Sequence, residues 1–483
     1  MKIPKEVYGV ARTLNMNRFE AYLVGGCVRD LLLHKEPKDW DIATNANPEQ
    51  IQKVFPESVY ENLFGTVGVK TESDDLKLKV IEVTTFRKDG AYADKRHPES
   101  VTFSKTIAED VSRRDFTINA LAMELQKKEL IDLFEGREDL KNKIIRTVGD
   151  PDARFNEDAL RLLRAVRFAA ELGFTIEEKI AEAIKKHAGL LEAIAKERIR
   201  DEFQKIIMSS RAMSGIQMLQ DYGLLKFILP ELQEGIDCGQ NKHHIYSVWE
   251  HNLRALDYTT QKNYSFAVRM ASLLHDVGKP RSKRGNGPES TFYGHDTIGA
   301  KMTLKILDRL HFSKDFVEQV AHLVRYHLFY YNVGEVTEAG VRRFLKRVGP
   351  ENIDDLMKVR EADRIGSGVP KAVPYKLRHL LFMIDKVKRD PISPKMIKLN
   401  GNELMSLLNL PPSPKIGAIL SVLLEEVIED PKRNTKKYLE SRAEKLNEFS
   451  DKELQSLAKK AKSVKDEFEA RAEEDIKKKH YVK

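Results

Sequence analysis

A glycine pair followed by two alternating aspartates, within residues 22–44, constrains the fold of this chain more than any other feature. The apolar stretch from Ala21 to Val24 leads into Gly25 and Gly26, and valine and leucines then recur at the spacing of one helix face. This order predicts a strand, a glycine turn and a helix. Such a turn lets the backbone approach phosphates closely, and the start of the helix favours anions.

The two aspartates that follow predict a metal site. Residues 38–43 are expected to form a second strand, with Asp39 and Asp41 on one face and Trp40 on the other. Neighbouring carboxylates suit Mg²⁺, a hard ion that takes one or two carboxylates together with substrate phosphates. Arg29 can act as a fork for phosphate oxygens. A lone Gly-Gly or Asp-x-Asp would instead indicate a plain turn with solvated aspartates, but here the two occur together.

The order and closeness of these residues resemble the signature of class II tRNA nucleotidyltransferases and the related bacterial poly(A) polymerases. The resemblance implies an α+β fold with a polymerase-beta-like nucleotidyltransferase head and a mixed sheet, followed by all-helical neck, HD and tail domains. The expected ranges are 1–148 for the head, 149–235 for the neck, 236–370 for the HD domain and 371–483 for the tail.

Two further segments of the expected head bear on the metal site. Residues 77–86 are rich in β-branched residues and predict a strand, which would place Glu82 as a third carboxylate beside the aspartates. A plain exposed glutamate fits the same pattern. Residues 87–101 combine glycine, proline, charges and aromatics without periodicity, and this predicts a long loop.

A polar block stands near the start of a helix expected over residues 110–125. Its members are Arg113, Arg114, Asp115 and Asn119. Taken alone, they could form a surface ion-pair cluster. The resemblance implies instead that this Arg-Arg-Asp-x-x-x-Asn block contacts the ribose and triphosphate of a nucleotide.

The helix expected over residues 156–172 carries Asp158 and Arg161 on one face. Beside a bound nucleotide, this pair offers an acceptor next to a donor, which matches cytosine and adenine but not uracil or guanine. Asp158 would accept from the N4 or N6 amino group, and Arg161 would donate to N3 of cytosine or N1 of adenine. A buried polar site strongly rejects a base that leaves its groups unpaired. The expected substrates are therefore CTP and ATP.

The simpler interpretation of this helix is a routine ion pair between Glu157 and Arg161. The resemblance favours the base-reading interpretation, because Glu-Asp-x-x-Arg matches the block with which the family replaces a nucleic-acid template. Arg164 and Arg167, further along the same face, would support the base or the triphosphate. Residues 196–207 resemble the helical motif at the end of the family's neck, and we interpret them as scaffold.

Histidines and aspartates recur in the third expected domain. The series is His251, His275, Asp276, His295, His327 and Asp363. Imidazole and carboxylate together suit divalent transition metals as well as Mg²⁺. The series resembles an HD-type metal-dependent phosphohydrolase, whose core ligands would be His251, His275, Asp276 and Asp363. His295 and His327 match positions that bind a second metal. Such a domain removes terminal phosphates or opens 2′,3′-cyclic phosphates, unless it retains the fold without activity.

The expected tail has helical patterns over residues 397–446 and a Lys/Glu/Ala-rich end, residues 450–483, that predicts a solvated helix with a frayed tip. Its basic residues are candidates for contact with the tRNA backbone, although a solvated helix face is the default interpretation of such charges. These candidates are Lys415, Lys432, Arg433, Lys436 and Lys437.

Net charge and cysteine content constrain the function and location of the chain less strongly than these motifs do. The net charge of +8 permits an anionic partner, but 82 basic residues stand among 74 acidic ones, so charge alone does not demonstrate RNA binding. Two cysteines, Cys27 and Cys238, are too few for a disulfide framework. A signal-peptide pattern and a run of about 18 apolar residues are both lacking, so we place the chain in the cytoplasm.

The resemblance implies that the chain completes and repairs the 3′-terminal CCA of tRNA. Its partners would be tRNA, CTP and ATP, with two Mg²⁺ ions at the head and a divalent metal in the HD domain; monomer and dimer are both open. A-adding, CC-adding and poly(A)-adding enzymes are alternatives. The intact loop at residues 87–101 argues against CC-only addition, and ENLFGTVGV at residues 61–69 resembles the tRNA enzymes. From other classes, a phosphohydrolase with an RNA-binding head and a purely structural RNA-binding protein stay open.

Overall fold

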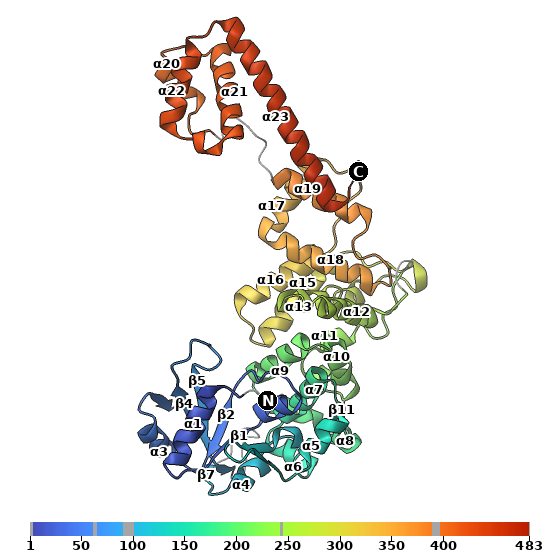
Figure 1. Cartoon of the computed structure of the whole chain (residues 1–483). Helices are drawn as coiled ribbons and strands as arrows, with labels where there is room; N and C mark the ends of the chain where they lie inside the picture. The colour runs from blue at the N-terminus through green and yellow to red at the C-terminus, as the bar shows by residue number, and fades with distance from the viewer. Residues whose placement is uncertain (1–2, 61–64, 90–100, 242–244, 389–396, 483) are drawn as a thin grey trace. The chain divides into compact units, whose positions relative to one another are not determined.

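The computed structural model describes residues 3–60, 65–89, 101–241, 245–388 and 397–482 (Figure 1). The chain divides into two compact units. The first comprises residues 1–328 and 354–372, and the second comprises residues 329–353 and 373–483. Within the described ranges, no helix has both the length and the apolar character needed to cross a membrane.

A seven-stranded mixed sheet forms the core of the head and confirms the predicted fold class. β2 and β5 run parallel, while the other neighbouring strands are antiparallel. Helices α1 (Lys5–Met16), α2 (Gly26–Leu32) and α3 (Pro48–Val54) belong to the same domain. In spatial order the strands are β3 (Ser58–Tyr60), β4 (Thr66–Lys70), β5 (Val80–Thr85), β2 (Asp41–Thr44), β1 (Ala21–Val24), β8 (Leu121–Glu124) and β9 (Glu129–Asp132).

The predicted strand, glycine turn and helix are confirmed, but two strands begin later than expected. β2 starts at Asp41, so Asp39 lies in the bend before it, and β5 starts at Val80 rather than at residue 77. The expected loop over residues 87–101 is wrong at its ends, where β6 (Arg87–Asp89) pairs antiparallel with β7 (Val101–Phe103). Its middle, residues 90–100, lies outside the described residues, as do residues 61–64 of ENLFGTVGV.

The helix predicted over residues 110–125 is wrong. Helix α4 (Ile107–Ser112) ends before the arginine pair, and a 3₁₀ turn (Thr117–Asn119) then leads into β8. β8 lies between β1 and β9, so its apolar side chains are buried on both faces of the sheet. A short continuous apolar run of this kind cannot be told from a buried helix by periodicity, and this explains the error.

The helix predicted over residues 156–172 is interrupted. α6 (Pro151–Glu157) ends at Asp158, whose φ of −138° and ψ of 105° are extended, and α7 (Leu160–Leu172) begins two residues later. Because Asp158 lies outside both helices, helical spacing does not place it beside Arg161. A backbone hydrogen bond of 3.0 Å from Arg161 N to the Asp158 carbonyl oxygen holds the two residues together instead.

Short elements and helices complete the first unit. α9 (Lys196–Met208), which confirms the helix expected there, packs against α7 on one side and α13 (Phe266–Leu274) on the other. The remaining elements of this unit include α5 (Gly136–Asn142), β10 (Ile144–Ile145), β11 (Thr175–Ile176), α8 (Glu178–His187), α10 (Ala212–Asp221), α11 (Pro230–Gln233), α12 (Val248–Gln261), α14 (Lys279–Ser282), α15 (His295–Arg309), α16 (Lys314–Tyr326) and α18 (Ile353–Gly366).

The second unit is helical throughout its described elements. It contains α17 (Glu338–Val348), α19 (Tyr375–Lys388), α20 (Gly401–Leu408), α21 (Pro414–Glu429), α22 (Lys436–Asn447) and α23 (Asp451–His480). Leu404, Leu423, Leu439 and Leu454 belong to the buried cluster that joins its last four helices.

The frayed tip predicted for the end of the chain is wrong. Ile476 and Val482 are buried against Phe382 of α19, and the side chains of Lys479 and His480 both bond to Asp385. The last turns of α23 are therefore held by apolar and charged contacts within the second unit.

Candidate functional site

A polar cleft of about 850 Å³ opens in the first unit between the head and the neck. It gathers almost all the head and neck residues that the sequence singles out. These are Gly25, Gly26, Arg29, Asp39, Asp41, Arg113, Arg114, Asp115, Asn119, Asp158, Arg161, Arg164 and Arg167. Glu82 is the exception: it lies beside Asp41 in the parallel β2–β5 register, with an exposed side chain outside this lining.

The glycine turn provides the close approach that its sequence predicts. Gly25 has a φ of 73°, in the left-handed region that favours glycine, and its N–H donates to the Leu121 carbonyl oxygen at 3.2 Å. A Cβ added at this position would lie 2.6 Å from Nη1 of Arg114. A larger residue would therefore displace an arginine from the cleft.

Asp39 and Asp41 both line the cleft, while Trp40 between them is buried on the other side of the chain. Burial raises the pKa of Asp41, the positive charge of Arg114 opposes that rise, and the negative charge of Asp39 adds to it. Two carboxylates that repel one another at the edge of a cleft fit a hard divalent cation, which relieves the repulsion.

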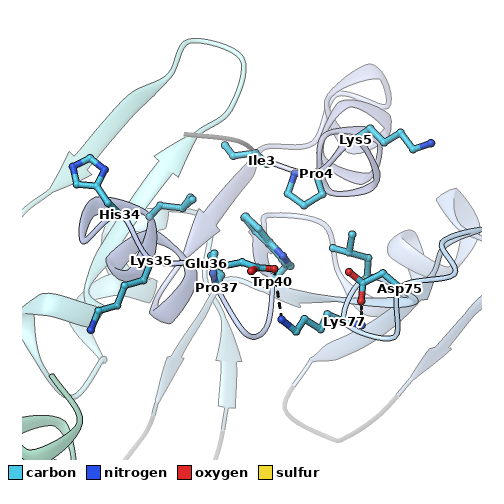
Figure 2. Close-up of a pocket in the computed structure, with 12 residues that line it drawn as sticks. Ile3, Pro4, Lys5, His34, Lys35, Glu36, Pro37, Trp40, Asp75 and Lys77 are labelled. Carbon is cyan, nitrogen blue, oxygen red and sulfur yellow. Dashed lines mark hydrogen bonds and ion pairs between the residues drawn. The ribbon is translucent and has the colours of Figure 1, made fainter. Parts of the chain in front are cut away.

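Trp40 also lines a second pocket of about 770 Å³, formed by the start of α1 and the loops at residues 34–37 and 75–78. Figure 2 shows Trp40 in this pocket near Glu36 and Lys77, which form an ion pair of 3.5 Å. The opposite placement of Trp40 and the two aspartates agrees with the expected alternation, although only Asp41 belongs to β2.

Asp110 fixes the arginine pair, a role that the sequence did not suggest. Its Oδ1 accepts from Nε and Nη2 of Arg113 at 3.0 and 2.7 Å, and its Oδ2 accepts from Nη2 of Arg114 at 3.1 Å. Although burial works in the other direction, the charges of Arg114 and Arg113 lower the pKa of Asp110. The available signal in the sequence was the spacing of three and four residues between Asp110, on α4, and the two arginines that follow this helix.

Asp115 and Asn119 continue the polar network. Asp115 accepts from Nε of Arg164 at 2.7 Å and from Nδ2 of Asn119 at 3.2 Å. Burial opposes ionisation, but the Arg164 charge prevails and lowers the pKa of Asp115 to about 2. Asn119 Oδ1 in turn accepts from Nη1 of Arg29 at 2.9 Å. These bonds join the glycine turn, the head and the neck around one cleft.

Asp158 and Arg161, the pair predicted to contact the base, each have partners within the protein. Arg161 Nη1 lies 2.5 Å from Glu157 Oε2, so the simple ion pair considered for this helix is present. Asp158 accepts from the N–H of Leu160 at 3.0 Å and forms an ion pair with Arg198, whose Nη2 lies 2.9 Å from Oδ2. Both members of the proposed pair still line the cleft.

Phe168 and Glu202 organise the remaining arginines. The guanidinium carbons of Arg167, Arg164 and Arg29 lie 4.1, 5.2 and 5.3 Å from the centre of the Phe168 ring. Glu202 Oε1 accepts from Nη1 of Arg167 at 3.1 Å. An aromatic face attracts cations, so one ring orders three positive side chains toward the cleft.

Helix α9 was interpreted as scaffold, yet it contributes to the cleft. Arg198 and Lys205 line it, and Glu202 lies between them on the same face. The signal in the sequence was the spacing of these charged residues, at positions i, i+4 and i+7 of a helix.

A second site lies in the HD region, where all six predicted residues are buried and come together. Asp276 Oδ2 lies 3.0 and 3.4 Å from Nε2 of His251 and His275, and its Oδ1 lies 3.4 and 3.6 Å from Nε2 of His295 and His327. Asp363 Oδ1 lies 3.5 Å from His251 Nε2. This donor set of imidazoles and carboxylates fits divalent metals.

The electrostatics of the HD site are those of a tightly packed cluster. Burial opposes the charge of His251, but its bonds to Asp276 and Asp363 raise the pKa to about 9. Burial lowers the pKa of His275. Lys279 Nζ lies 2.5 Å from Asp276 Oδ2, and Arg360 pairs with Asp363. The cluster therefore carries its own positive charges around the carboxylates.

Some basic residues predicted to contact tRNA in the tail already have partners. Lys415 donates to the Asn447 carbonyl oxygen at 2.8 Å, and Lys436 pairs with Glu403 at 3.1 Å. Arg433 lies 3.5 Å from Asp430. The structure places these residues on or between α20, α21 and α22.

Three known protein families match parts of this chain. Residues 21–146 match the Poly A polymerase head domain, and residues 248–367 match the HD domain. Residues 173–236 match the family described as Probable RNA and SrmB-binding site of polymerase A. The fold is thus that of a nucleotidyltransferase with an HD domain.

Relatives that match over most of their length indicate which kind of nucleotidyltransferase this chain resembles. The chain is 33% identical over 430 residues to the CCA-adding enzyme of a Geobacillus species, covering 89% of this chain and 94% of the relative. It is 32% identical over 449 residues to the CCA-adding enzyme of Enterococcus faecalis, covering 93% and 97%. The crystal structure of the Bacillus stearothermophilus CCA-adding enzyme in complex with CTP is similar, with a TM-score of 0.61 and 28% identity over 92% of this chain and 98% of that one. The chain belongs to the family of CCA-adding enzymes.

Proposed function

We propose that this chain completes and repairs the 3′-terminal CCA of tRNA, with CTP and ATP as substrates. The observation that carries the proposal is one cleft that holds the paired aspartates, the arginine block and the Asp158–Arg161 pair. The 3′-hydroxyl of the RNA would attack the α-phosphorus of the nucleotide in line, and pyrophosphate would leave. Positioning and charge stabilisation account for most of the catalysis in such transfers.

Asp39 and Asp41 would hold Mg²⁺, with Glu82 as the third candidate ligand because of its register with Asp41. Mg²⁺ bound there supplies neutralisation of the triphosphate and activation of the attacking hydroxyl. Arg29, Arg114 and Arg164 supply positive charge from three different segments. The roles of these residues rest on their common position in the cleft and on the donor and acceptor chemistry of their side chains.

Base selection would follow from the hydrogen-bonding pattern of the neck. Asp158 accepts a hydrogen bond from the amino group of cytosine or adenine, and Arg161 donates one to the adjacent ring nitrogen. Uracil and guanine present the opposite pattern and would leave both side chains unpaired. The protein thereby takes the place of a nucleic-acid template.

Extension of a labelled tRNA that ends at its discriminator base tests the proposal. Addition of two C residues with CTP alone, and of one further A with both nucleotides, is the expected result. Addition of A only to a pre-made CC end would show an A-adding enzyme, C residues without a final A would show a CC-adding enzyme, and a long A tail would show a poly(A) polymerase. No addition would overturn nucleotidyl transfer.

A second function, hydrolysis of phosphate esters at RNA ends, is favoured by the HD cluster. Asp276 directs one oxygen toward His251 and His275 and the other toward His295 and His327, an arrangement that fits two neighbouring metal ions. Divalent metals held there would supply an activated water for attack on phosphorus.

Release of phosphate from terminally phosphorylated RNA, and opening of a 2′,3′-cyclic phosphate, test this second function. Each substrate would be incubated with Mg²⁺, Mn²⁺, Co²⁺ or Ni²⁺ after chelator treatment. Turnover with at least one metal, lost in the His275→Ala variant, is expected. If no substrate is turned over with any metal, the domain retains the fold without the activity.

A further inference from the structure

We infer that Arg198 is a specificity-determining positioning residue, which holds Asp158 so that a single acceptor site faces the incoming base. The inference rests on the proposed function, because it concerns how that same cleft selects nucleotides. Arg198 lies on α9, outside the Glu-Asp-x-x-Arg block, and reaches Asp158 across 40 residues of sequence.

The contact between the two side chains is two-pronged. Arg198 Nη2 donates to Asp158 Oδ2 at 2.9 Å, and Nη1 donates to Oδ1 at 3.3 Å. The N–H of Leu160 donates to the same Oδ1 at 3.0 Å. A planar guanidinium that engages both oxygens fixes the plane of the carboxylate as well as its position.

The contacts of Asp158 leave one of its hydrogen-bond acceptor sites available to a base. A carboxylate offers about four lone-pair sites, two on each oxygen. Leu160 and Arg198 take both sites of Oδ1, and Arg198 takes one site of Oδ2. One site remains, on Oδ2, and Asp158 lines the cleft. A base that presents an amino group can use this site, whereas a base that presents a carbonyl oxygen would meet an acceptor.

Asp158 needs such a contact because its backbone does not fix it. The residue lies in the extended break between α6 and α7, with φ −138° and ψ 105°, so no helical turn limits its side chain. The carboxylate of Asp158 accepts a hydrogen bond from the nearby N–H of Leu160 and forms an ion pair with Arg198. Selection by hydrogen bonding requires an acceptor in a defined position, since a carboxylate that can rotate would tolerate several bases.

Helix α9 is a firm platform for this task. Arg269 of α13 donates from Nη1 to the carbonyl oxygens of Ile207 and Ser209, both at 3.1 Å, at the end of α9. Arg269 is itself buried. On the cleft side, Glu202 binds Arg167 of α7. Arg198 therefore projects from a helix that is held on two sides.

A competing interpretation is that Arg198 only blocks Asp158 until a nucleotide displaces it. The two interpretations predict opposite effects of removing the guanidinium. A blocker, once removed, would lower the KM for CTP and leave selection among bases unchanged. A positioning residue, once removed, would lower selectivity and leave no gain in affinity for the correct nucleotide.

The test compares Arg198→Met, Arg198→Lys and the matched control Arg200→Met in full-length protein. Arg200 is on the same helix and contacts Asp201 and the carbonyl oxygen of His311, so its loss removes the same charge without touching Asp158. For each variant, kcat and KM are measured separately for CTP, UTP, ATP and GTP, in single additions to tRNA ends that accept C or A. Thermal unfolding is recorded alongside.

Arg198→Met is expected to reduce the kcat/KM ratios of CTP to UTP and of ATP to GTP by about tenfold or more. Arg198→Lys, which keeps the charge but loses the fork, should give a smaller reduction, and Arg200→Met should give none. Unchanged ratios in Arg198→Met, or a lower KM for CTP with unchanged ratios, would overturn the inference. If Arg198→Met does not fold, the same kcat/KM ratios measured for Arg198→Lys decide: a reduction supports the inference, and unchanged ratios overturn it.

Two further comparisons separate this inference from the function on which it rests. A wild-type protein that adds neither C nor A would sink the proposed function, whereas a working wild type with a fully selective Arg198→Met would sink only the role of Arg198. In the Asp158→Ala background, Arg198→Met should cause no additional loss of selectivity, because Arg198 acts through Asp158. An additive loss would contradict that route.

Discussion

Asp115 and Arg164 form an ion pair with a Nη2–Oδ2 distance of 2.6 Å that ties the head to the neck beside the polar cleft. Asp115 follows the arginine pair of the head, and Arg164 belongs to α7. Because Asp115 is buried, its negative charge depends on this partner and on Asn119. The same bond therefore serves both the placement of an arginine in the cleft and the stability of the head–neck junction.

Because of this ion pair, the stability of the folded protein should fall as the pH is lowered. The folded-state pKa of Asp115 is about 2, below its ordinary value of 3.8, so the folded protein binds this proton less readily than the unfolded chain. The stabilisation is complete above pH 4 and is lost as the pH falls toward 2; a shift of this size corresponds to about 2 kcal/mol. The Tm advantage of wild type over Asp115→Asn should be largest above pH 5 and shrink as the pH falls to 3. An advantage that does not change with pH would contradict this origin.

Replacing Asp39 or Asp41 with Ala should reduce nucleotide addition by about a thousandfold or more, because a carboxylate proposed to bind Mg²⁺ is lost. Binding of tRNA, measured by filter retention, should change little, since neither residue adds positive charge for the RNA backbone. Asp74→Ala, at an exposed aspartate of the same domain, is the matched control and should keep full activity. Persistent addition by Asp41→Ala would refute the assignment of the catalytic site.

Asp158→Ala should relax discrimination against UTP and GTP, because the acceptor that excludes carbonyl-bearing bases is removed. Incorporation of each of the four nucleotides into the same tRNA end measures this. Thermal unfolding of the variant serves as the control for folding. Unchanged selectivity would refute the idea that protein side chains replace a template.

Asp110→Asn should raise the KM for both nucleotides by about tenfold, since an amide cannot hold Arg113 and Arg114 as a carboxylate does. A smaller effect on kcat is expected, because Asp110 acts through the arginines. Glu109→Gln, at the exposed neighbouring position, provides the control. If the KM of Asp110→Asn equals that of the control, the arginines do not depend on this clamp.

The sequence allowed the glycine turn of the head, the buried His/Asp cluster and most of the residues that line the cleft to be predicted. The strand, turn and helix at residues 21–32 follow from local pattern, and the six residues of the HD cluster follow from a series that matches a known family. The sequence pattern did not reveal that two helices meet at Asp158. Asp150 and Pro151 do signal the start of a separate helix before residue 156, because the Asp150 side chain caps α6 by accepting from the N–H of Ala153 at 2.9 Å.

Contacts between residues far apart in the sequence could not be predicted, for a different reason. Arg198 meets Asp158 only because α9 packs against α7, and no local pattern of either segment contains that contact. The strand β8 was mistaken for helix because neighbouring strands bury both of its faces. In each case tertiary packing, rather than local preference, determined the outcome.

The two sites should be separable by a single substitution in the HD cluster. Asp276→Asn replaces the carboxylate that faces all four histidines, so hydrolysis of RNA-end phosphates should fall to background. Addition of CCA should persist, because the polar cleft is lined by residues of the head and the neck. The converse variant, Asp41→Ala, should lose addition and retain hydrolysis. Measuring both activities in both variants, with the metal content of each, checks this independence, and loss of both activities in a folded Asp276→Asn protein would show that the sites are coupled.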